Sequence, residues 1–149
     1  MCSYCGCENI EVIGRFMAEH VDLINASADL GLACESGDST TIQVAARTLA
    51  ELLHPHGGAE EVGLFTVLAE DPEFSEHVRE LCGEHVDLDA RLSAIITGEH
   101  TTYADFDRAL RRHIDREENG VFPAAAIAFA GPEWQRVADL TPPPVRLPG

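Results

Sequence analysis

The sequence lacks any apolar run long enough to cross a membrane. A transmembrane helix needs about 20 consecutive, mostly apolar residues, whereas the hydrophobic residues of this chain, 45% of the total, are interspersed with polar ones. The chain also lacks a charged segment followed by an apolar stretch and a cleavage site, which is the pattern of a secretory leader. We therefore expect a soluble, cytoplasmic protein with no membrane partner.

Positive charge is scarce as well. Ten Lys and Arg residues face 26 Asp and Glu residues, so the formal net charge is −16 and the sequence pI is about 4.6. Such an excess of negative charge repels a phosphate backbone, and we expect no nucleic-acid partner. Most acidic side chains are interpreted as a solvated exterior, which can also attract metal cations.

A disulfide framework is a third feature that we do not expect, because five cysteines are an odd number and no secretion signal accompanies them. Cys34 and Cys82 lie among apolar residues and are interpreted as small buried hydrophobic side chains. Cys2, Cys5 and Cys7 fall within six residues, CSYCGC. They can hold a metal, form a redox pair or simply lie on the surface, and three thiolates are one short of a closed zinc site.

Strand signals are weak, whereas apolar residues recur at helical spacing through four segments. These run from about residue 9 to 34, 41 to 69, 72 to 96 and 102 to 122. Asp38 is one of the candidate caps of the second helix, and Asp71 with Pro72 is a favourable start for the third. Pro55 is expected to kink the second helix, and whether the fourth helix bends or stops at Pro123 is open.

Short loops between four amphipathic helices predict an all-α, antiparallel, up-down four-helix bundle. A short helix is expected from about residue 132, followed by an extended Pro-rich tail from residue 141. We divide the chain into a Cys-rich N-terminal segment (1–8), the bundle (9–130) and the C-terminal helix with its tail (131–149).

The most informative feature is an internal repeat. Residues 56–65 read HGGAEEVGLF and residues 113–122 read HIDREENGVF, so both follow the pattern His, three residues, Glu-Glu, one residue, Gly, an aliphatic residue and Phe. A shorter repeat, EHVDL, precedes each of them at residues 19–23 and 84–88. The chain is therefore interpreted as two copies of one unit.

The repeat supplies six candidate metal ligands. Residues four apart lie on one face of a helix, so each His of the longer repeat can point inward together with the Glu four residues later. The His of each EHVDL repeat lies on an apolar stripe. The predicted ligands are therefore His20, His56, Glu60, His85, His113 and Glu117.

This ligand set suits iron, manganese or zinc. If both carboxylates bridge, each metal has two His and two carboxylate oxygens, and an oxo or hydroxo bridge leaves one open position for a small molecule. The alternative is a bundle with hydrogen-bonded core histidines and no metal. Buried carboxylates without a nearby cation are costly, which favours metal binding.

Several other residues admit two interpretations. Asp89, four residues after His85, is an extra ligand, an acceptor for an imidazole N–H or a polar residue at the edge of the stripe. Gly63 and Gly120 either leave room for a small ligand or permit close helix packing. Glu61 and Glu118 follow the predicted bridging residues and are interpreted as supporting or solvated groups.

The combined motif, EH, HxxxEE, EH and HxxxEE with Gly and an aliphatic-Phe pair, resembles the hemerythrin-like (HHE cation-binding) family over residues 9–129. The resemblance implies an antiparallel four-helix bundle with a non-haem di-iron centre. Oxygen-carrying members have two His four apart on the third helix, the second matching His85, but here Leu81 occupies the other position. The ligand pattern is more similar to bacterial proteins linked to the repair of iron centres after oxidative or nitrosative damage.

These observations predict an oxo- or hydroxo-bridged di-iron protein in which zinc or manganese can substitute for iron. One function class is an enzyme that consumes peroxide, O2 or NO at the open positions. The other is a non-enzymatic module that binds iron or senses O2 or NO. The oligomeric state does not follow from the sequence.

Overall fold

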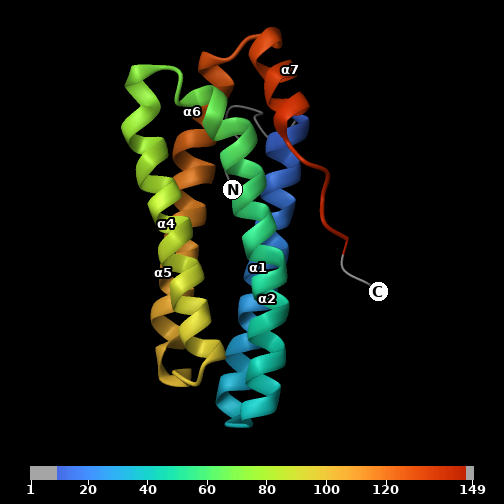
Figure 1. The fold of residues 1–149 in the computed structure, drawn as a ribbon, viewed down its shortest axis with the longest axis vertical. Helices are drawn as coiled ribbons and strands as arrows, with labels where there is room; N and C mark the ends of the chain where they lie inside the picture. The colour runs from blue at the N-terminus through green and yellow to red at the C-terminus, as the bar shows by residue number, and fades with distance from the viewer. Residues whose placement is uncertain (1–9, 147–149) are drawn as a thin grey trace.

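Four long helical segments run antiparallel along the length of the molecule in a computed structural model that describes residues 10–146 (Figure 1). The Cys2, Cys5 and Cys7 cluster lies outside the described residues. The α-helices are α1 (Glu11–Ser36), α2 (Ser39–Glu60), α3 (Thr66–Leu68), α4 (Pro72–Ile96), α5 (Tyr103–Arg116), α6 (Phe122–Ala128) and α7 (Gly131–Leu140). Two π-helical turns, η2 (Glu61–Phe65) and η4 (Glu117–Val121), and one 3-10 turn, η3 (His100–Thr102), complete the described elements.

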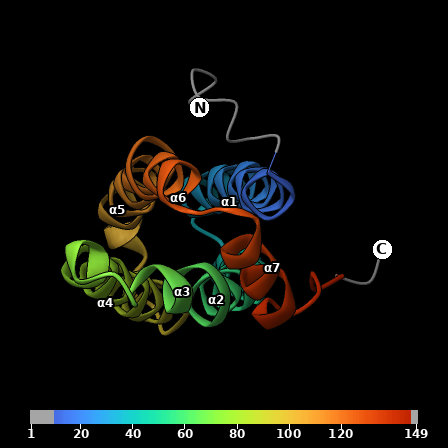
Figure 2. The same cartoon turned by 90° about the horizontal axis from the view of Figure 1, so that it is seen from above.

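The helices form a ring in which each packs against the next in chain order. α1 contacts α2, α2 contacts α4, α4 contacts α5, and α5 returns to α1, as the view along the bundle shows (Figure 2). α7 crosses one end of the bundle against η2 and α3, and residues 142–146 form neither helix nor strand. The predicted four-helix bundle with a short C-terminal helix is therefore confirmed. None of the described helices combines the length and apolar character that spanning a bilayer requires.

Two predicted helix starts are confirmed in detail. The Asp38 side chain accepts a hydrogen bond from the Thr41 backbone N–H at 3.0 Å, at the start of α2. The Asp71 side chain accepts one from the Glu73 backbone N–H at 2.9 Å, and Pro72 occupies the first turn of α4. Each cap satisfies a backbone donor that the helix itself leaves unpaired.

The two prolines do not terminate their helices. α2 continues through Pro55 to Glu60, and the fourth segment continues past Pro123, which lies in the first turn of α6. The hydrogen-bonding pattern changes at the π-helical turns η2 and η4, which occupy equivalent places in the two repeats. Single π-helical turns inside longer helices occur frequently at functional sites.

The bundle core consists of two apolar clusters separated by a polar layer. One cluster lies toward α7 and includes Ile13, Phe16, Leu81 and Phe122. The other lies toward the opposite end and includes Leu23, Leu49, Leu88 and Leu110. Along α1 the change of cluster falls between Met17 and Leu23, where His20 is buried.

The two described cysteines partly match their prediction. Cys34 and Cys82 are partly buried free thiols that pack against the two apolar clusters. Burial raises the pKa of both thiols, and for Cys82 burial together with the charge of Glu61 raises it to about 11. Both are therefore protonated and unreactive at neutral pH.

Candidate metal centre

All six residues that the sequence predicted as ligands meet in the polar layer. Each of the four long helical segments contributes one His, and the two carboxylates come from the α2–η2 and α5–η4 junctions. All six side chains are buried, and both carboxylates are completely inaccessible to solvent. The structure brings together His20, His56, Glu60, His85, His113 and Glu117.

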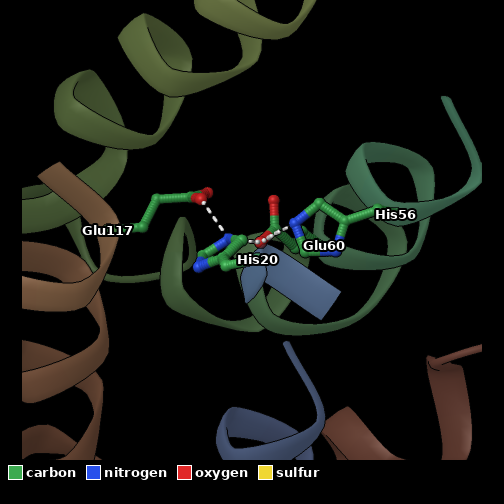
Figure 3. A group of neighbouring side chains, drawn as sticks. All are labelled: His20, His56, Glu60 and Glu117. Atoms are coloured by element: carbon green, nitrogen blue, oxygen red, sulfur yellow. Dashed lines mark ion pairs between the residues drawn. The ribbon is translucent and has the colours of Figure 1, made fainter. Parts of the chain in front are cut away.

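One half of the site combines α1 and α2. His56 Nε2 lies 2.9 Å from Glu60 Oε1, and His20 Nε2 lies 3.1 Å from Glu117 Oε1 and 3.5 Å from Glu60 Oε1. Figure 3 shows Glu60 between the two imidazoles, with Glu117 approaching His20 from the other side. These four groups each offer one ligand atom within 4.8 Å of the others, so they can hold one metal ion.

The other half combines α4 and α5 in the same way. His85 Nε2 lies 3.1 Å from Glu60 Oε2, and His113 Nε2 lies 3.2 Å from Glu117 Oε1. These four residues form a second group whose ligand atoms lie within 4.8 Å of one another. Glu60 and Glu117 belong to both groups, whereas each His belongs to one, which is the arrangement expected for carboxylates that bridge two ions.

The inward-facing atoms lack hydrogen-bond partners. The Nε2 atoms of all four His and both oxygens of each bridging Glu are buried and form no hydrogen bond within the described residues. Isolated buried polar atoms are costly. A core of hydrogen-bonded histidines would not leave eight converging atoms without a hydrogen bond, and here the imidazoles and carboxylates contact one another only as ion pairs. The donor set of imidazoles and carboxylates therefore fits a pair of divalent cations.

The outward-facing nitrogen of each His contacts a further carboxylate. Along α1 and α2, His56 Nδ1 lies 2.9 Å from Glu19. Along η2 and α4, His85 Nδ1 lies 2.8 Å from Glu61. A carboxylate on Nδ1 fixes the ring orientation and tautomer and makes Nε2 a stronger ligand.

The second half of the ring repeats this pattern. His113 Nδ1 lies 2.8 Å from Glu84, and His20 Nδ1 lies 2.7 Å from Glu118. Each supporting carboxylate therefore comes from the helical segment that precedes its His around the ring. Of the two interpretations left open for Glu61 and Glu118, supporting or solvated, these contacts favour the first. Glu19 and Glu84 were not predicted, although they are the first residues of the repeated EHVDL segment.

Two of the supporting carboxylates also contact arginine. Arg15 Nε donates to Glu19 at 2.8 Å, and Arg116 donates to Glu84. The bonds to His56 and Arg15 oppose the effect of burial, and the pKa of Glu19 lies below its usual value. Glu19 is therefore ionised and can stabilise positive charge on the imidazole.

The matching Phe residues at the ends of the two long repeats have a shared structural role. Phe65 stacks on His85 with ring centroids 6.0 Å apart, and Phe122 stacks on His20 at 5.8 Å. Leu81, which replaces a His of oxygen-carrying hemerythrins, is fully buried in the apolar cluster on the same side. Apolar side chains therefore shield this side of the site from water.

Asp89 does not reach the site. Its carboxylate lies 3.3 Å from Nδ1 of the exposed His54, and its side chain is 43% exposed. Of the interpretations that the sequence left open, the structure favours a polar residue at the edge of the stripe. The helix register explains this position, because Leu88 takes the inward direction one turn beyond His85.

Gly63 permits close packing and does not leave space for a ligand. A Cβ atom on Gly63 would collide with Thr141 Oγ1 and lie 3.2 Å from Thr141 Cβ. A Cβ on Gly120 would meet only His77, at 3.9 Å. Gly63 therefore allows the chain that follows α7 to rest on η2.

Gly63→Ala is expected to destabilise the protein by about 1–2 kcal/mol, because Thr141 must move and give up its 2.6 Å hydrogen bond to the Val137 carbonyl. Gly58→Ala is the matched control, since its Cβ meets nothing within 4 Å, and it should stabilise the helix by roughly 0.5–1 kcal/mol. Urea unfolding of both variants measures the difference. Equal stability of the two variants would contradict this account.

The metal-free site retains protons on the imidazoles of His20, His56 and His85. Burial alone would lower the pKa of His56 and His85, but Glu60 and the neighbouring carboxylates outweigh it and raise both to about 9. The pKa of His20 is also raised well above its usual value by Glu117, Glu118 and Glu60, despite burial. The pKa of Glu60 lies well below its usual value, because three imidazoles outweigh its complete burial. Protons thus provide the positive charge that a metal would supply.

Metal binding at pH 7 is therefore expected to release protons. His56 and His85 have pKa values of about 9, so they are protonated at pH 7 and each must lose its Nε2 proton to bind a metal. The apparent metal affinity should rise as the pH increases from 7 toward 9. Calorimetric titrations in buffers of different ionisation enthalpy measure the released protons, and a binding heat independent of the buffer would refute this expectation.

An antiparallel helical bundle with four His and two shared Glu residues in its core defines a class of proteins whose core can hold cations. The family model described as the hemerythrin HHE cation binding domain matches residues 11–125, most of the chain. The chain therefore belongs to the hemerythrin HHE family. No curated protein and no solved structure matches it significantly.

Proposed function

We propose that the protein holds a carboxylate-bridged pair of iron ions and reacts there with a small oxidant such as peroxide, O2 or NO. The proposed ligands are His20 and His56 for one ion, His85 and His113 for the other, and Glu60 and Glu117 for both. The observation that supports this proposal most strongly is the convergence of eight buried polar atoms without hydrogen-bond partners.

The ligand count supports reactivity. Each ion would receive two imidazoles and one oxygen from each bridging carboxylate, which is fewer than the six ligands that iron accommodates. When bound, two ferrous ions supply two electrons, the number that converts H2O2 and two protons into two water molecules. Leu81 and the stacked Phe65 and Phe122 limit the access of water.

The residues of the chain have separate tasks in this proposal. The four imidazoles and two bridging carboxylates hold the ions. Glu19 and Glu84, each bonded to an arginine, fix the orientation of the His56 and His113 imidazoles. Glu61 is 40% exposed and contacts His85, so it offers a path for protons between solvent and the edge of the site. No amino-acid nucleophile is required.

The test is peroxide consumption by anaerobically iron-loaded protein. We expect faster turnover than with the same concentration of free iron, in the presence of an added electron donor, and loss of this turnover in Glu60→Ala. Metal analysis should give about two irons per chain in the unmodified protein, one for each group of ligands, and iron exposed to air should show near-ultraviolet oxo-bridge absorption.

Two outcomes would redirect the proposal. Turnover no faster than that of free iron, with two irons bound, would support the alternative function of an iron-binding or O2/NO-sensing module. Zinc or no metal in the purified protein, with His56→Ala and His113→Ala folding unchanged, would contradict the di-iron centre itself.

A further inference from the structure

Two of the hollows that lead from the surface to the candidate metal centre lie at equivalent places in the internal repeat. A further hollow, between α1 and α2, reaches His56 beside Arg15 and Glu19. The α2–α4 hollow is lined by His54, Gly57, Gly58, Glu61, His85 and Asp89. The α1–α5 hollow is lined by His20, Ile24, Arg111, Ile114, Asp115 and Glu118. The α2–α4 hollow is the smaller of the two, at about 200 Å³ against about 330 Å³, so volume does not identify it as the entrance for metal ions. The side chains that line the two hollows differ in kind.

The α2–α4 hollow lacks side chains where it approaches the site. A Cβ on Gly57 would lie 3.2 Å from His85 Nδ1, so the absence of a side chain lets the imidazole pack directly against α2. A Cβ on Gly58 would meet nothing within 4 Å. His85 is the most exposed of the four proposed His ligands, at 8%, and its Nε2 has no hydrogen-bond partner. The hollow therefore ends at a proposed metal ligand, whose Nδ1 contacts Glu61 and whose Nε2 faces the centre.

The α1–α5 hollow has bulkier and less favourable side chains at the corresponding positions. Ile114 replaces Gly57 and is buried, and Ile24 replaces Asp89 and packs on the apolar core. The guanidinium of Arg111 replaces His54. At this end the supporting carboxylate, Glu118, is buried, whereas Glu61 at the other end is 40% exposed. A cation approaching here would meet apolar side chains and an arginine paired with Asp107, beside the carboxylates of Asp115 and Glu118.

The α2–α4 hollow has no Arg or Lys in its lining. The exposed His54 lies 3.3 Å from the Asp89 carboxylate. Glu61 follows deeper, with one oxygen 2.8 Å from His85 Nδ1. An imidazole and two carboxylates are all ligands for divalent cations, and they form a series from the surface to the proposed ligand His85.

We propose that divalent cations reach the paired site through the α2–α4 hollow, bound in turn by His54 with Asp89, by Glu61 and by His85. The inference rests on the proposed metal centre but concerns the rate of loading, not the metal content at equilibrium. The negative charge of the chain attracts cations to the whole surface. In this proposal the cations then enter through the α2–α4 hollow and not through the α1–α5 hollow.

The test is the rate of Co2+ uptake by metal-free protein at low ionic strength, followed by visible absorption. Asp89→Asn should slow uptake by about fivefold, because steering by charge acts on the association rate. Asp115→Asn is the matched control, because it removes the same charge from the α1–α5 hollow. It should leave the rate within about twofold of the unmodified protein, and both variants should still bind two Co2+ per chain at equilibrium.

A second pair of variants tests the path sterically. Gly58→Leu fills open space at the α2–α4 hollow and should slow loading by about tenfold, whereas Asp115→Leu at the equivalent position should not. Because Gly58 also lines the hollow at His56, slowing by Gly58→Leu without slowing by Asp89→Asn would assign the route to that hollow and overturn the proposal. Equal slowing by both members of either pair, or no slowing by Asp89→Asn and Gly58→Leu, would overturn the proposed route. Failure of the unmodified protein to bind Co2+ would instead overturn the metal centre, and the route with it.

Discussion

Glu60→Ala is expected to remove both metal ions, whereas His56→Ala should remove only one. Glu60 belongs to both ligand groups, with one oxygen near His20 and His56 and the other 3.1 Å from His85. Its loss leaves each ion with two imidazoles and one carboxylate and eliminates a bridge between them. His56 belongs to one group only, so its loss leaves the group formed around His85 and His113 complete.

Metal analysis after loading with excess Fe2+ and gel filtration measures this difference. We expect about two ions per chain in the unmodified protein, about one in His56→Ala and in His113→Ala, and close to none in Glu60→Ala. The reason is that each His belongs to one group of ligands, whereas Glu60 belongs to both. Glu51→Ala, an exposed carboxylate on the same helix, is the control and should retain two. Two ions in Glu60→Ala would show that the carboxylate does not bridge, and circular dichroism checks that each variant is folded.

Metal loading is expected to raise the stability of the fold more than any single substitution discussed above. The polar layer lies between the two apolar clusters and joins all four long helical segments. A ligand that binds only the folded state stabilises it by about 2.7 kcal/mol at 100 times its Kd, so two sites add about 5 kcal/mol. For a domain of this size that corresponds to a rise in Tm of roughly 10–20 °C.

Thermal unfolding with and without Fe2+, under anaerobic conditions, measures this effect. Glu60→Ala serves as the control, because the same metal concentration should then give little stabilisation. An equal rise in Tm for both proteins would mean that the ions bind the acidic surface and not the core. Addition of a chelator should reverse the rise in the unmodified protein, since the stabilisation depends on the free metal concentration.

The fold and the six proposed ligands follow from local regularities that are visible in the sequence. Apolar residues at helical spacing predicted the four long segments, and Asp71 with Pro72 marked the start of α4 correctly. His56 and Glu60 are four residues apart, a spacing that places both on one face of a helix independently of the tertiary packing. The repetition of this pair in His113 and Glu117 then indicated a site with internal symmetry.

Contacts between helices do not have such a local signal. The sequence offered Glu19 and Glu84 as part of a repeat, but only the packing of neighbouring helices brought them to His56 and His113. The hydrogen bonding of the segment after Glu60 was likewise not predicted, because a π-helical turn has no clear signature in composition or spacing.

The sequence by itself therefore determined the helices, the bundle and the inward face that carries the proposed ligands, because periodicity within one helix decides these. Only the tertiary structure decided that Asp89 contacts His54 away from the site and that Gly63 accommodates Thr141. It also decided which side chains line the hollows at the two ends of the repeated sequence. These features depend on how far each helix is rotated and displaced against its neighbours, which the spacing of residues along one helix does not specify.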